Sequence, residues 1–244
     1  MAESKNWVLL RGLARGQGHW GTFPQRMKER FPLDKIELLD LPGNGTRNSE
    51  ISPLAIVDYV SELRKHCSFS KRAEPFRILS LSLGSMVAVE WMRQFPHEIE
   101  KTFLVCTSSK GHSPFYHRFQ WANYLKAMSL FGAETEQWEK TILEMVTNNH
   151  ERRAEELPFL VKHSEKFPVK PMNILRQMKA ASQYQFPKEA PGPIHLMGSY
   201  GDNLVSPQCT LRIAERWGLE AVMHPWAGHD IPIDDPLWLL EHLL

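Results

Sequence analysis

Residues 78–89 read ILSLSLGSMVAV, and this stretch decides what kind of fold the chain adopts. An apolar run that starts at Phe76 ends in a corner of small residues, and an apolar pattern with helical spacing follows at once. A strand that turns this sharply into a helix holds one side chain clear of the sheet, and the positions two before and two after it must be small. Ser80 and Gly84 fill those positions, with serine where the usual G-x-S-x-G pattern has its first glycine. The pattern therefore marks Ser82 as a candidate nucleophile.

Two later segments supply what a serine nucleophile needs, which is a base and an acid that orients the base. Residues 193–199 predict a strand, and Asp202 lies in the loop just past its carboxyl end. Residues 221–224 predict another strand, with His229 in the loop that follows. We therefore expect Asp202 to orient His229, and His229 to take the proton of Ser82.

The three segments LSLSLGSM, GSYGDNLVSP and WAGHD together resemble the catalytic segments of the α/β-hydrolase superfamily, in which the chain order is Ser, Asp, His. The resemblance implies an α/β fold with a mostly parallel, six-stranded sheet, helices on both faces and an inserted helical cap. It also implies an oxyanion hole of backbone amides, one of which usually follows a His-Gly pair after the first strand. Leu13 matches that position, although Arg11 stands where the histidine would be, and the second donor would be the amide of Leu83.

The rest of the chain alternates predicted strands and helices except in one long segment. Strands are predicted at residues 7–10, 35–40, 75–81, 101–106, 193–199 and 219–224, all parallel and joined by right-handed crossovers. The segment without this alternation predicts helices near residues 113–131, 134–148, 151–163 and 170–183. We therefore expect a core made of residues 1–106 and 188–244, with residues 107–187 as the helical cap.

The first predicted cap helix is rich in aromatic residues. Its aromatic members are Phe115, Tyr116, Phe119, Trp121, Tyr124 and Phe131. In the family that the chain resembles, such caps cover the active site and line the acyl pocket. Simple packing of the cap onto the core is the more ordinary role, and we expect it for most of these side chains.

Several other residues compete for roles at the site, and we expect them to be structural. Ser80 and Ser85 flank the candidate nucleophile but do not occupy the elbow position. Asp230 is the rival acid, but it adjoins His229 in sequence and is poorly placed to reach the Nδ1 atom of that residue. Cys106 ends a strand away from the elbow and is predicted to lie in the core.

The sequence indicates neither a metal nor a cofactor. The 11 histidines include no H-x-H or H-x-x-x-H pair, and the 3 cysteines include no C-x-x-C pair. Gly16, Gly18 and Gly21 fit the pattern G-x-G-x-x-G, but the motif begins several residues after the strand. The next strand ends in a turn after Asp40 rather than in a ribose-binding acid, so a nucleotide site is not expected.

Composition limits the size class, the partners and the compartment. The 244 residues suit one large α/β domain with an insertion. The net charge of +1 gives no support to nucleic acid as a partner. No apolar run approaches the ~20 residues of a membrane helix, and the start of the chain has no signal-peptide pattern. The few, odd-numbered cysteines suit a reducing compartment, so we expect a cytoplasmic protein without a membrane partner.

These features predict a serine hydrolase that cleaves a carboxylic ester or thioester through an acyl-serine intermediate. A non-catalytic ligand-binding protein of the same fold remains an alternative. A lyase or C–C hydrolase is another, because a triad does not determine which bond is broken. In size and cap placement the chain also resembles the carboxylesterases that demethylate pimeloyl-acyl-carrier-protein methyl ester. That resemblance implies an acyl carrier protein as a partner, in addition to a small acyl ester as substrate.

The second half of the predicted cap is basic. Its charged residues from 160 to 187 are Lys162, Lys166, Lys170, Arg176 and Lys179, against Glu165 alone. A solvated helical face is the ordinary explanation of such a charge pattern. A docking patch for an acidic carrier protein, beside the mouth of the pocket, is the alternative.

Overall fold

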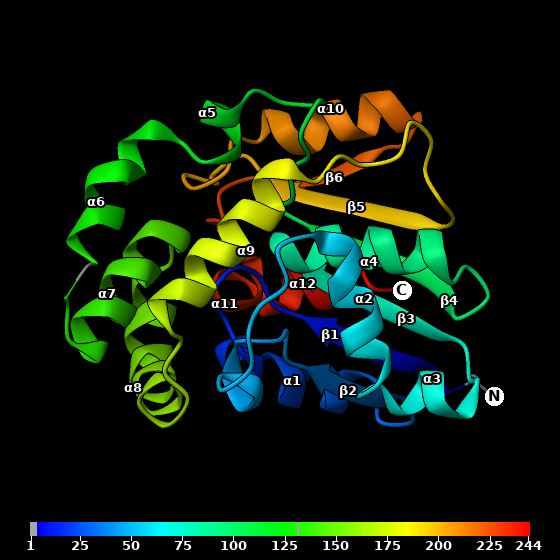
Figure 1. Cartoon of the computed structure of the whole chain (residues 1–244), viewed down its shortest axis with the longest axis horizontal. Helices are drawn as coiled ribbons and strands as arrows, with labels where there is room; N and C mark the ends of the chain where they lie inside the picture. Colours follow the sequence, from blue (N-terminus) through cyan, green and yellow to red (C-terminus); the bar gives the residue numbers. More distant parts are fainter. Residues whose placement is uncertain (1–3, 131) are drawn as a thin grey trace.

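The computed structural model describes residues 4–130 and 132–244, and its centre is a six-stranded sheet (Figure 1). The strands are β1 (Asn6–Leu10), β2 (Lys35–Leu39), β3 (Phe76–Leu81), β4 (Ile99–Val105), β5 (Ile194–Ser199) and β6 (Ala221–His224). Their order across the sheet is β2-β1-β3-β4-β5-β6, and every neighbouring pair is parallel. The predicted strands and their parallel arrangement are confirmed.

The direction in which the sheet grows reverses beside β1. The chain passes from β1 outward to β2, then returns to the other side of β1 to form β3, and continues in sequence order from there. In open parallel sheets, ligands bind at the carboxyl ends of the strands next to such a reversal. The loop after β1 and the corner after β3, which holds Ser82, meet at this place.

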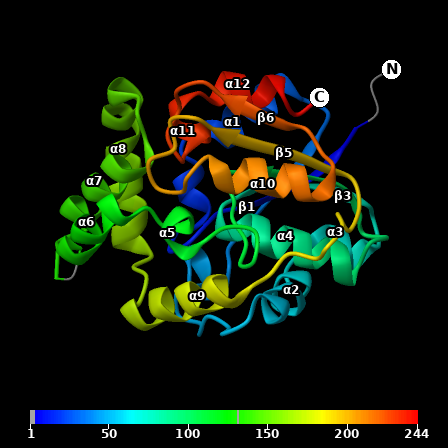
Figure 2. The same cartoon turned by 90° about the horizontal axis from the view of Figure 1, so that it is seen from above.

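Helices cover both faces of the sheet (Figure 2). One face is covered by α2 (Ile56–Arg64), α3 (Ser68–Arg72), α4 (Leu83–Gln94) and α10 (Gln208–Trp217), and the other by α1 (Phe23–Arg30), α11 (Ile231–Asp234) and α12 (Pro236–Glu241). Successive side chains of a strand point to opposite faces. Val8 and Leu10 therefore pack on the first face, and Trp7 and Leu9 on the second. Burial on both faces explains why β1 is apolar from Trp7 to Leu10 rather than alternating with polar residues.

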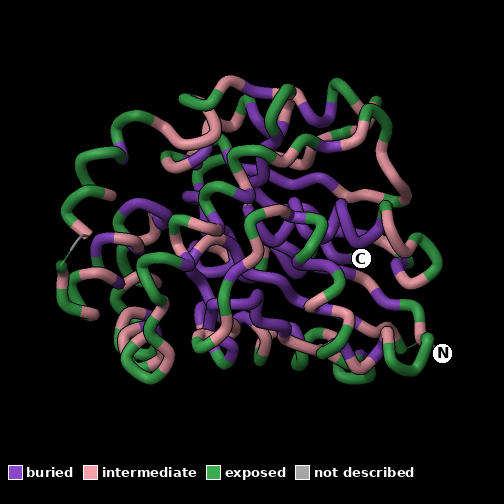
Figure 3. The backbone as a smooth tube through the Cα atoms, viewed as in Figure 1, coloured by how far each residue is buried: buried purple, intermediate pink, exposed green. Residues whose placement is uncertain are grey.

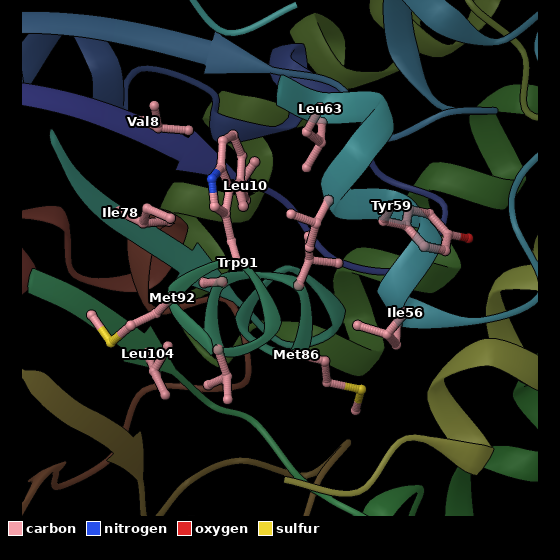
Figure 4. Close-up of a cluster of buried hydrophobic side chains, with 14 of the residues drawn as sticks. Val8, Leu10, Ile56, Tyr59, Leu63, Ile78, Met86, Trp91, Met92 and Leu104 are labelled. Carbon is pink, nitrogen blue, oxygen red and sulfur yellow. The ribbon is translucent and has the colours of Figure 1, made fainter. Parts of the chain in front are cut away.

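Helix α4 forms the centre of the larger core cluster (Figure 4). Its Trp91 and Met92 pack with Ile78 and Leu104 of the sheet, and Met86 packs with residues of α2. Burying a large apolar side chain contributes about 1.5–3 kcal/mol. This helix is buried on nearly all sides, so the corner from which it starts is held by the core itself.

The segment between β4 and β5 is helical, and its described residues contain no strand. It forms α5 (Phe115–Arg118), the 3-10 turn η3 (Trp121–Asn123), α6 (Tyr124–Ser129), α7 (Thr135–Val146), α8 (His150–Lys166) and α9 (Pro171–Gln183). In Figure 1, α6, α7 and α8 lie on the left, beyond the carboxyl ends of the strands. The division into a core domain and a cap domain stays a prediction. No helix of the described residues is both long enough and apolar enough to cross a membrane.

The prediction of one continuous helix near residues 113–131 is wrong. The backbone is extended at Phe119 and Gln120, which separate α5 from η3. The amide of Gln120 donates to the carbonyl of Leu204 at 2.9 Å, and its side chain donates to the carbonyl of Asp202 at 2.9 Å. These hydrogen bonds to the loop after β5 replace helical ones, so tertiary contacts override the local helical preference.

The prediction that most aromatic residues of this segment pack onto the core is also wrong. The exposed ones are Phe115, Tyr116, Trp121 and Tyr124. Phe119 is the exception in this group, because it packs against a small cluster that contains Leu143 of α7. Phe131 lies outside the described residues. The extended backbone at Phe119 and Gln120 breaks the single helix on which these side chains were expected to share a face, and Figure 3 shows much of this stretch as exposed.

A buried polar cluster fastens α7 and α8 to the loop after β1. Glu139 of α7 pairs with Arg15 at 2.6 Å and accepts a hydrogen bond from Ser164 of α8 at 2.7 Å. The Nε2 atom of His19 lies 3.4 Å from the same carboxylate. Burial opposes the ionisation of Glu139, but Arg15, His19 and Ser164 hold its pKa below the usual range. Burial and the charge of Arg15 lower the pKa of His19 to about 4.

The unfolding free energy should therefore fall as the pH drops from 6.5 to about 4. In this window the folded protein keeps His19 neutral, whereas the unfolded chain takes up a proton there and is favoured. The shift corresponds to at most about 3 kcal/mol. We expect His19→Asn to flatten this part of the curve of unfolding free energy against pH, measured by urea titration. The same substitution at the exposed His97 should keep the wild-type slope, and parallel curves for His19→Asn and wild type would contradict the neutral, buried state of His19.

Candidate active site

Ser82 occupies a strained corner between β3 and α4. Its φ of 56° and ψ of −114° are rarely adopted by residues with a side chain. Such strain costs about 1–3 kcal/mol and clusters at functional sites. The corner is held because the amide of Ser82 donates to the carbonyl of Val105 at 2.9 Å, and its carbonyl accepts from the hydroxyl of Thr107 at 3.1 Å. The residue is partly exposed, as a nucleophile at an elbow must be.

The two serines beside the corner, Ser80 and Ser85, stabilise its backbone through hydrogen bonds. The Ser85 hydroxyl donates to the carbonyl of Ser80 at 2.9 Å, and the Ser80 hydroxyl donates to the carbonyl of Phe103 at 3.1 Å. Both serines are fully buried. Their hydroxyl groups therefore bind the backbone behind the corner and do not reach the side on which Ser82 is exposed.

Asp202 and His229, from the loops after β5 and β6, are brought into direct contact. The Nδ1 atom of His229 lies 2.7 Å from Oδ2 of Asp202, and each residue is 4% exposed. The other oxygen, Oδ1, accepts the amides of Leu204 and Val205, both at 2.9 Å. The carboxylate is thus oriented by its own loop. An imidazole that is bound through Nδ1 in this way presents Nε2 as the proton acceptor.

The end of β4 links the serine corner to this acid–base pair. Val105 accepts the amide of Ser82, and the next residue, Cys106, has its sulfur within 4.8 Å of the polar side-chain atoms of Asp202 and His229. Cys106 is buried, as predicted, but the sequence does not indicate that it contacts the acid. Burial and the negative charge of Asp202 raise the pKa of its thiol well above the usual value. A metal would need the thiolate, so these three residues are poorly suited to bind one.

The loop after β1 lies directly against the elbow. A Cβ atom at Gly12 would lie 3.1 Å from the Cβ of Ser82, so a side chain there would displace the loop or the elbow by a few tenths of an ångström. The amide of Ala14 is committed, because it donates to Oε1 of Gln177 on α9 at 2.8 Å. The amide of Leu13 remains the candidate donor of this loop. Leu83 is the first residue of α4, where amides have no helical partner and the helix dipole is positive.

Arg11 and Asp230 form a buried ion pair that the sequence does not indicate. Nη1 of Arg11 lies 3.0 Å from Oδ1 of Asp230, and Nη2 lies 2.5 Å from Oδ2. Each side chain is 2% exposed. Because Arg11 occupies both carboxylate oxygens of Asp230, this residue does not orient the imidazole of His229. The geometry therefore favours Asp202 as the acid. The two residues are 219 positions apart, so their pairing depends on the complete fold.

A separate groove of about 360 Å³ lies between α2, α4 and α9, away from these residues. Glu90, Arg93 and Tyr184 are among the residues that line it. The hydroxyl of Tyr184 donates to Glu90 at 2.9 Å, and Arg93 pairs with Glu90 at 2.6 Å. Since these polar groups already satisfy one another, the groove does not compete with the Ser82 corner as a reactive site.

No protein-family profile matches the sequence, and no curated protein matches it. Solved structures match over nearly the whole chain. The enol-lactonase from Burkholderia xenovorans LB400 aligns with a TM-score of 0.78 and 14% identity, over 99% of this chain and 90% of that one. A thermophilic esterase from Thermogutta terrifontis aligns with a TM-score of 0.74 and 14% identity, over 100% of this chain and 89% of that one. The 2-hydroxy-6-oxo-6-phenylhexa-2,4-dienoate hydrolase from Rhodococcus sp. strain RHA1 aligns with a TM-score of 0.70 and 18% identity, over 98% and 90%.

The chain therefore has the α/β-hydrolase fold that its three motif segments predict. Identities of 14–18% establish the fold and leave the substrate open. The relatives are named for different reactions, which agrees with the rule that function on a common fold must be argued from the site.

Gly84→Ala should destabilise the protein, although the same change at an ordinary helical position stabilises. A Cβ atom at Gly84 would lie 2.6 Å from the carbonyl oxygen of Leu10 and 2.7 Å from that of Arg11. Overpacking against a fixed backbone costs about 1–3 kcal/mol, and here it would push α4 away from the end of β1. We expect a lower unfolding free energy by urea titration. Ser85→Ala, which adds no atoms to the same turn, should lose only about 1 kcal/mol, and an unchanged or higher stability of Gly84→Ala would contradict the close packing.

Proposed function

We propose that the protein is a serine hydrolase that cleaves a carboxylic ester or thioester. The observation that carries the proposal is the buried 2.7 Å contact between His229 Nδ1 and Asp202, at the same edge of the parallel sheet as a serine in strained geometry. A serine hydroxyl is a weak nucleophile at neutral pH and needs a base that is itself oriented by a third group. The arrangement supplies both of these groups.

In the proposed mechanism, Ser82 Oγ attacks the acyl carbonyl carbon while His229 Nε2 takes the hydroxyl proton. Asp202 keeps the imidazole in the required tautomer and stabilises the imidazolium. The amides of Leu13 and Leu83 bind the oxyanion, and the loss of one such donor costs about 3 kcal/mol in known cases. His229 then gives its proton to the leaving alcohol or thiol. Water, deprotonated by His229, finally cleaves the acyl-serine and releases the acid.

The two alternative classes receive less support from the site. A ligand-binding protein gains nothing from a strained serine or from a buried acid–base pair, and both features cost folding stability. A lyase or C–C hydrolase would use the same groups, and one structural relative is named as a hydrolase of 2-hydroxy-6-oxo-6-phenylhexa-2,4-dienoate. Turnover of simple aliphatic esters separates an ester hydrolase from a ligand-binding protein.

Nitrophenyl esters from acetate to decanoate provide the test. We expect wild type to hydrolyse them with a preferred acyl length, and Ser82→Ala to lose several orders of magnitude in kcat. Ser85→Ala is the matched control, because it removes a hydroxyl from the same turn and should retain most of the activity. Hydrolysis that survives Ser82→Ala and disappears in Ser85→Ala would show that the nucleophile is misassigned.

For the substrate class, we propose an acyl group delivered by an acidic carrier protein, as in pimeloyl-acyl-carrier-protein methyl ester. The support is a basic surface on α8 and α9. Its exposed lysines are Lys162, Lys166, Lys170 and Lys179. Arg176, which the charge pattern also includes, is partly used internally, because its Nε donates to the carbonyl of Ser52.

Two features of α9 favour docking over an ordinary solvated face. Apolar side chains lie exposed among the lysines at Met172, Leu175 and Met178, which gives a carrier protein apolar area to cover. The opposite side of α9 contacts the loop after β1, which carries the proposed oxyanion donor Leu13 and is called the oxyanion loop below. The contact is the hydrogen bond between Gln177 and Ala14. A carrier that docks on α9 would therefore be separated from this loop by the width of one helix, about 10 Å.

Salt should separate a carrier-bound ester from a small one. Exposed charges act mainly on the rate of encounter and are screened beyond about 10 Å at ~0.1 M salt. We expect kcat/KM for an acyl-carrier-protein ester to fall as the salt concentration rises, and kcat/KM for a neutral nitrophenyl ester to stay constant. Lys166→Glu with Lys170→Glu should reproduce the loss at low salt.

Lys35→Glu with Lys71→Glu is the matched control, because these exposed lysines lie on β2 and α3, away from the basic surface. It should leave kcat/KM for the carrier-bound ester unchanged. Equal salt responses of the two substrates would remove the carrier protein from the proposal and leave a hydrolase of small esters.

A further inference from the structure

We propose that the buried ion pair of Arg11 and Asp230 is a positioning pair, which locks the loop of the oxyanion donor to the loop of the catalytic base. The inference rests on the proposed hydrolase function and adds two residues that do not touch the substrate. Arg11 directly precedes the Gly12-Leu13 segment, and Asp230 directly follows His229. A displacement of either side chain is therefore passed to a neighbour that takes part in the reaction.

The geometry of the pair suits a rigid link. Two parallel hydrogen bonds, at 3.0 Å and 2.5 Å, determine both the separation and the orientation of the two groups. The guanidinium carbon also lies 5.0 Å from the centre of the Trp20 ring, which limits its movement further. A lysine would supply the charge but not the planar two-point contact. Both side chains are 2% exposed, so little water competes for the bonds.

Each loop has other anchors, but these lead to the inserted helices or to the loops after β2 and β5 instead of to the other loop. The oxyanion loop is bound to α9 through Ala14 and Gln177. The base loop is bound to the end of α7, because the amide of Asp230 donates to the carbonyl of Val146 at 2.8 Å. Among the described residues, the ion pair is the polar side-chain contact that joins the two loops directly.

Catalysis requires the two loops to be in register. The amide of Leu13 must bind the carbonyl oxygen while the Nε2 atom of His229 takes the proton of the serine that attacks the same carbonyl group. A donor must lie about 2.7–3.1 Å from the oxyanion. A misplacement of ~1 Å can reduce the rate about 100-fold. The ion pair carries no net charge, so its main contribution at the carbonyl is geometric and not electrostatic.

A double-mutant cycle with Arg11→Met and Asp230→Leu tests the pair. Each single variant leaves one buried charge without its partner, so we expect lower Tm and lower kcat in both. The double variant contains neither charge, and replacing a buried pair by apolar residues is often neutral for stability. We expect Tm to recover in the double variant while kcat stays about 10- to 100-fold below wild type, with little change in KM for a small ester.

A boronic acid that forms a tetrahedral adduct with Ser82 gives an independent readout. The affinity of the boronic acid should fall in parallel with kcat in the double variant. The adduct, like the transition state, needs the oxyanion amide and His229 in the correct relative position. The control is Arg64→Met with Glu98→Met, which removes another two-point pair, at 2.6 Å and 3.0 Å, remote from Ser82. That control should leave both kcat and boronic acid affinity at wild-type values, whatever its effect on Tm.

The possible outcomes separate the positioning role from the proposed function. If kcat recovers together with Tm in the double variant, the pair is only structural and the inference is wrong. Single variants that lose Tm and keep the wild-type kcat overturn it as well. Failure of the proposed function looks different, because wild type itself would then neither hydrolyse esters nor bind the boronic acid, and the positioning role would fall with it.

Discussion

The strained backbone at Ser82 is the constraint on which the rest of the structure depends. A residue with a side chain keeps a φ of 56° only when its surroundings hold it there. Here the buried helix α4 holds the corner from one side, and Val105 and Thr107 at the end of β4 hold it from the other. The strand order places β3 between β1 and β4, so the loops of both neighbours reach the corner. The sheet therefore brings the loop after β1, Ser82, Asp202 and His229 to one edge.

Buried charge is concentrated in the loop that follows β1. Arg11 and Arg15 are both buried, and each pairs with a buried carboxylate, Asp230 and Glu139 respectively. Buried ion pairs add little net stability compared with apolar packing, because removing both charges from water is costly. These pairs instead determine geometry, since one links the loop to the residue after His229 and the other links it to α7. The loop after β1 is thus held by specific contacts on several sides, although it has no regular secondary structure at Gly12 and Leu13.

The sequence predicted those parts of the site that local patterns encode. Ser82, Asp202 and His229 each follow a short apolar strand, so the motif and the strand could be identified together. The ion pair of Arg11 and Asp230 could not be predicted, because it joins residues 219 positions apart whose contact depends on the sheet order. The interruption of the first predicted cap helix at Gln120 could not be predicted either, because it results from hydrogen bonds to the loop that contains Asp202.

Two further elements show where local patterns become too weak. Helix α1 was not predicted, because only Phe23 and Met27 of its eight residues are buried and a glycine-rich stretch precedes it. Cys106 was correctly expected to be buried, but its position beside the acid depends on the register of β4 against β5. In both cases the missing information was tertiary: which side of a short element faces the core, and which strands are neighbours.

The central claim is that Ser82 becomes covalently acylated, and a fluorophosphonate measures this most directly. Such a reagent forms a stable phosphonyl adduct with a serine that a neighbouring base activates. After incubation, intact mass spectrometry counts the adducts, and peptide mapping locates them. We predict one adduct per chain, on Ser82, and none when Asp202→Asn removes the acid that orients His229. A folded wild-type protein that takes up no reagent, or that carries it on Ser80 or Ser85 instead, would contradict the account.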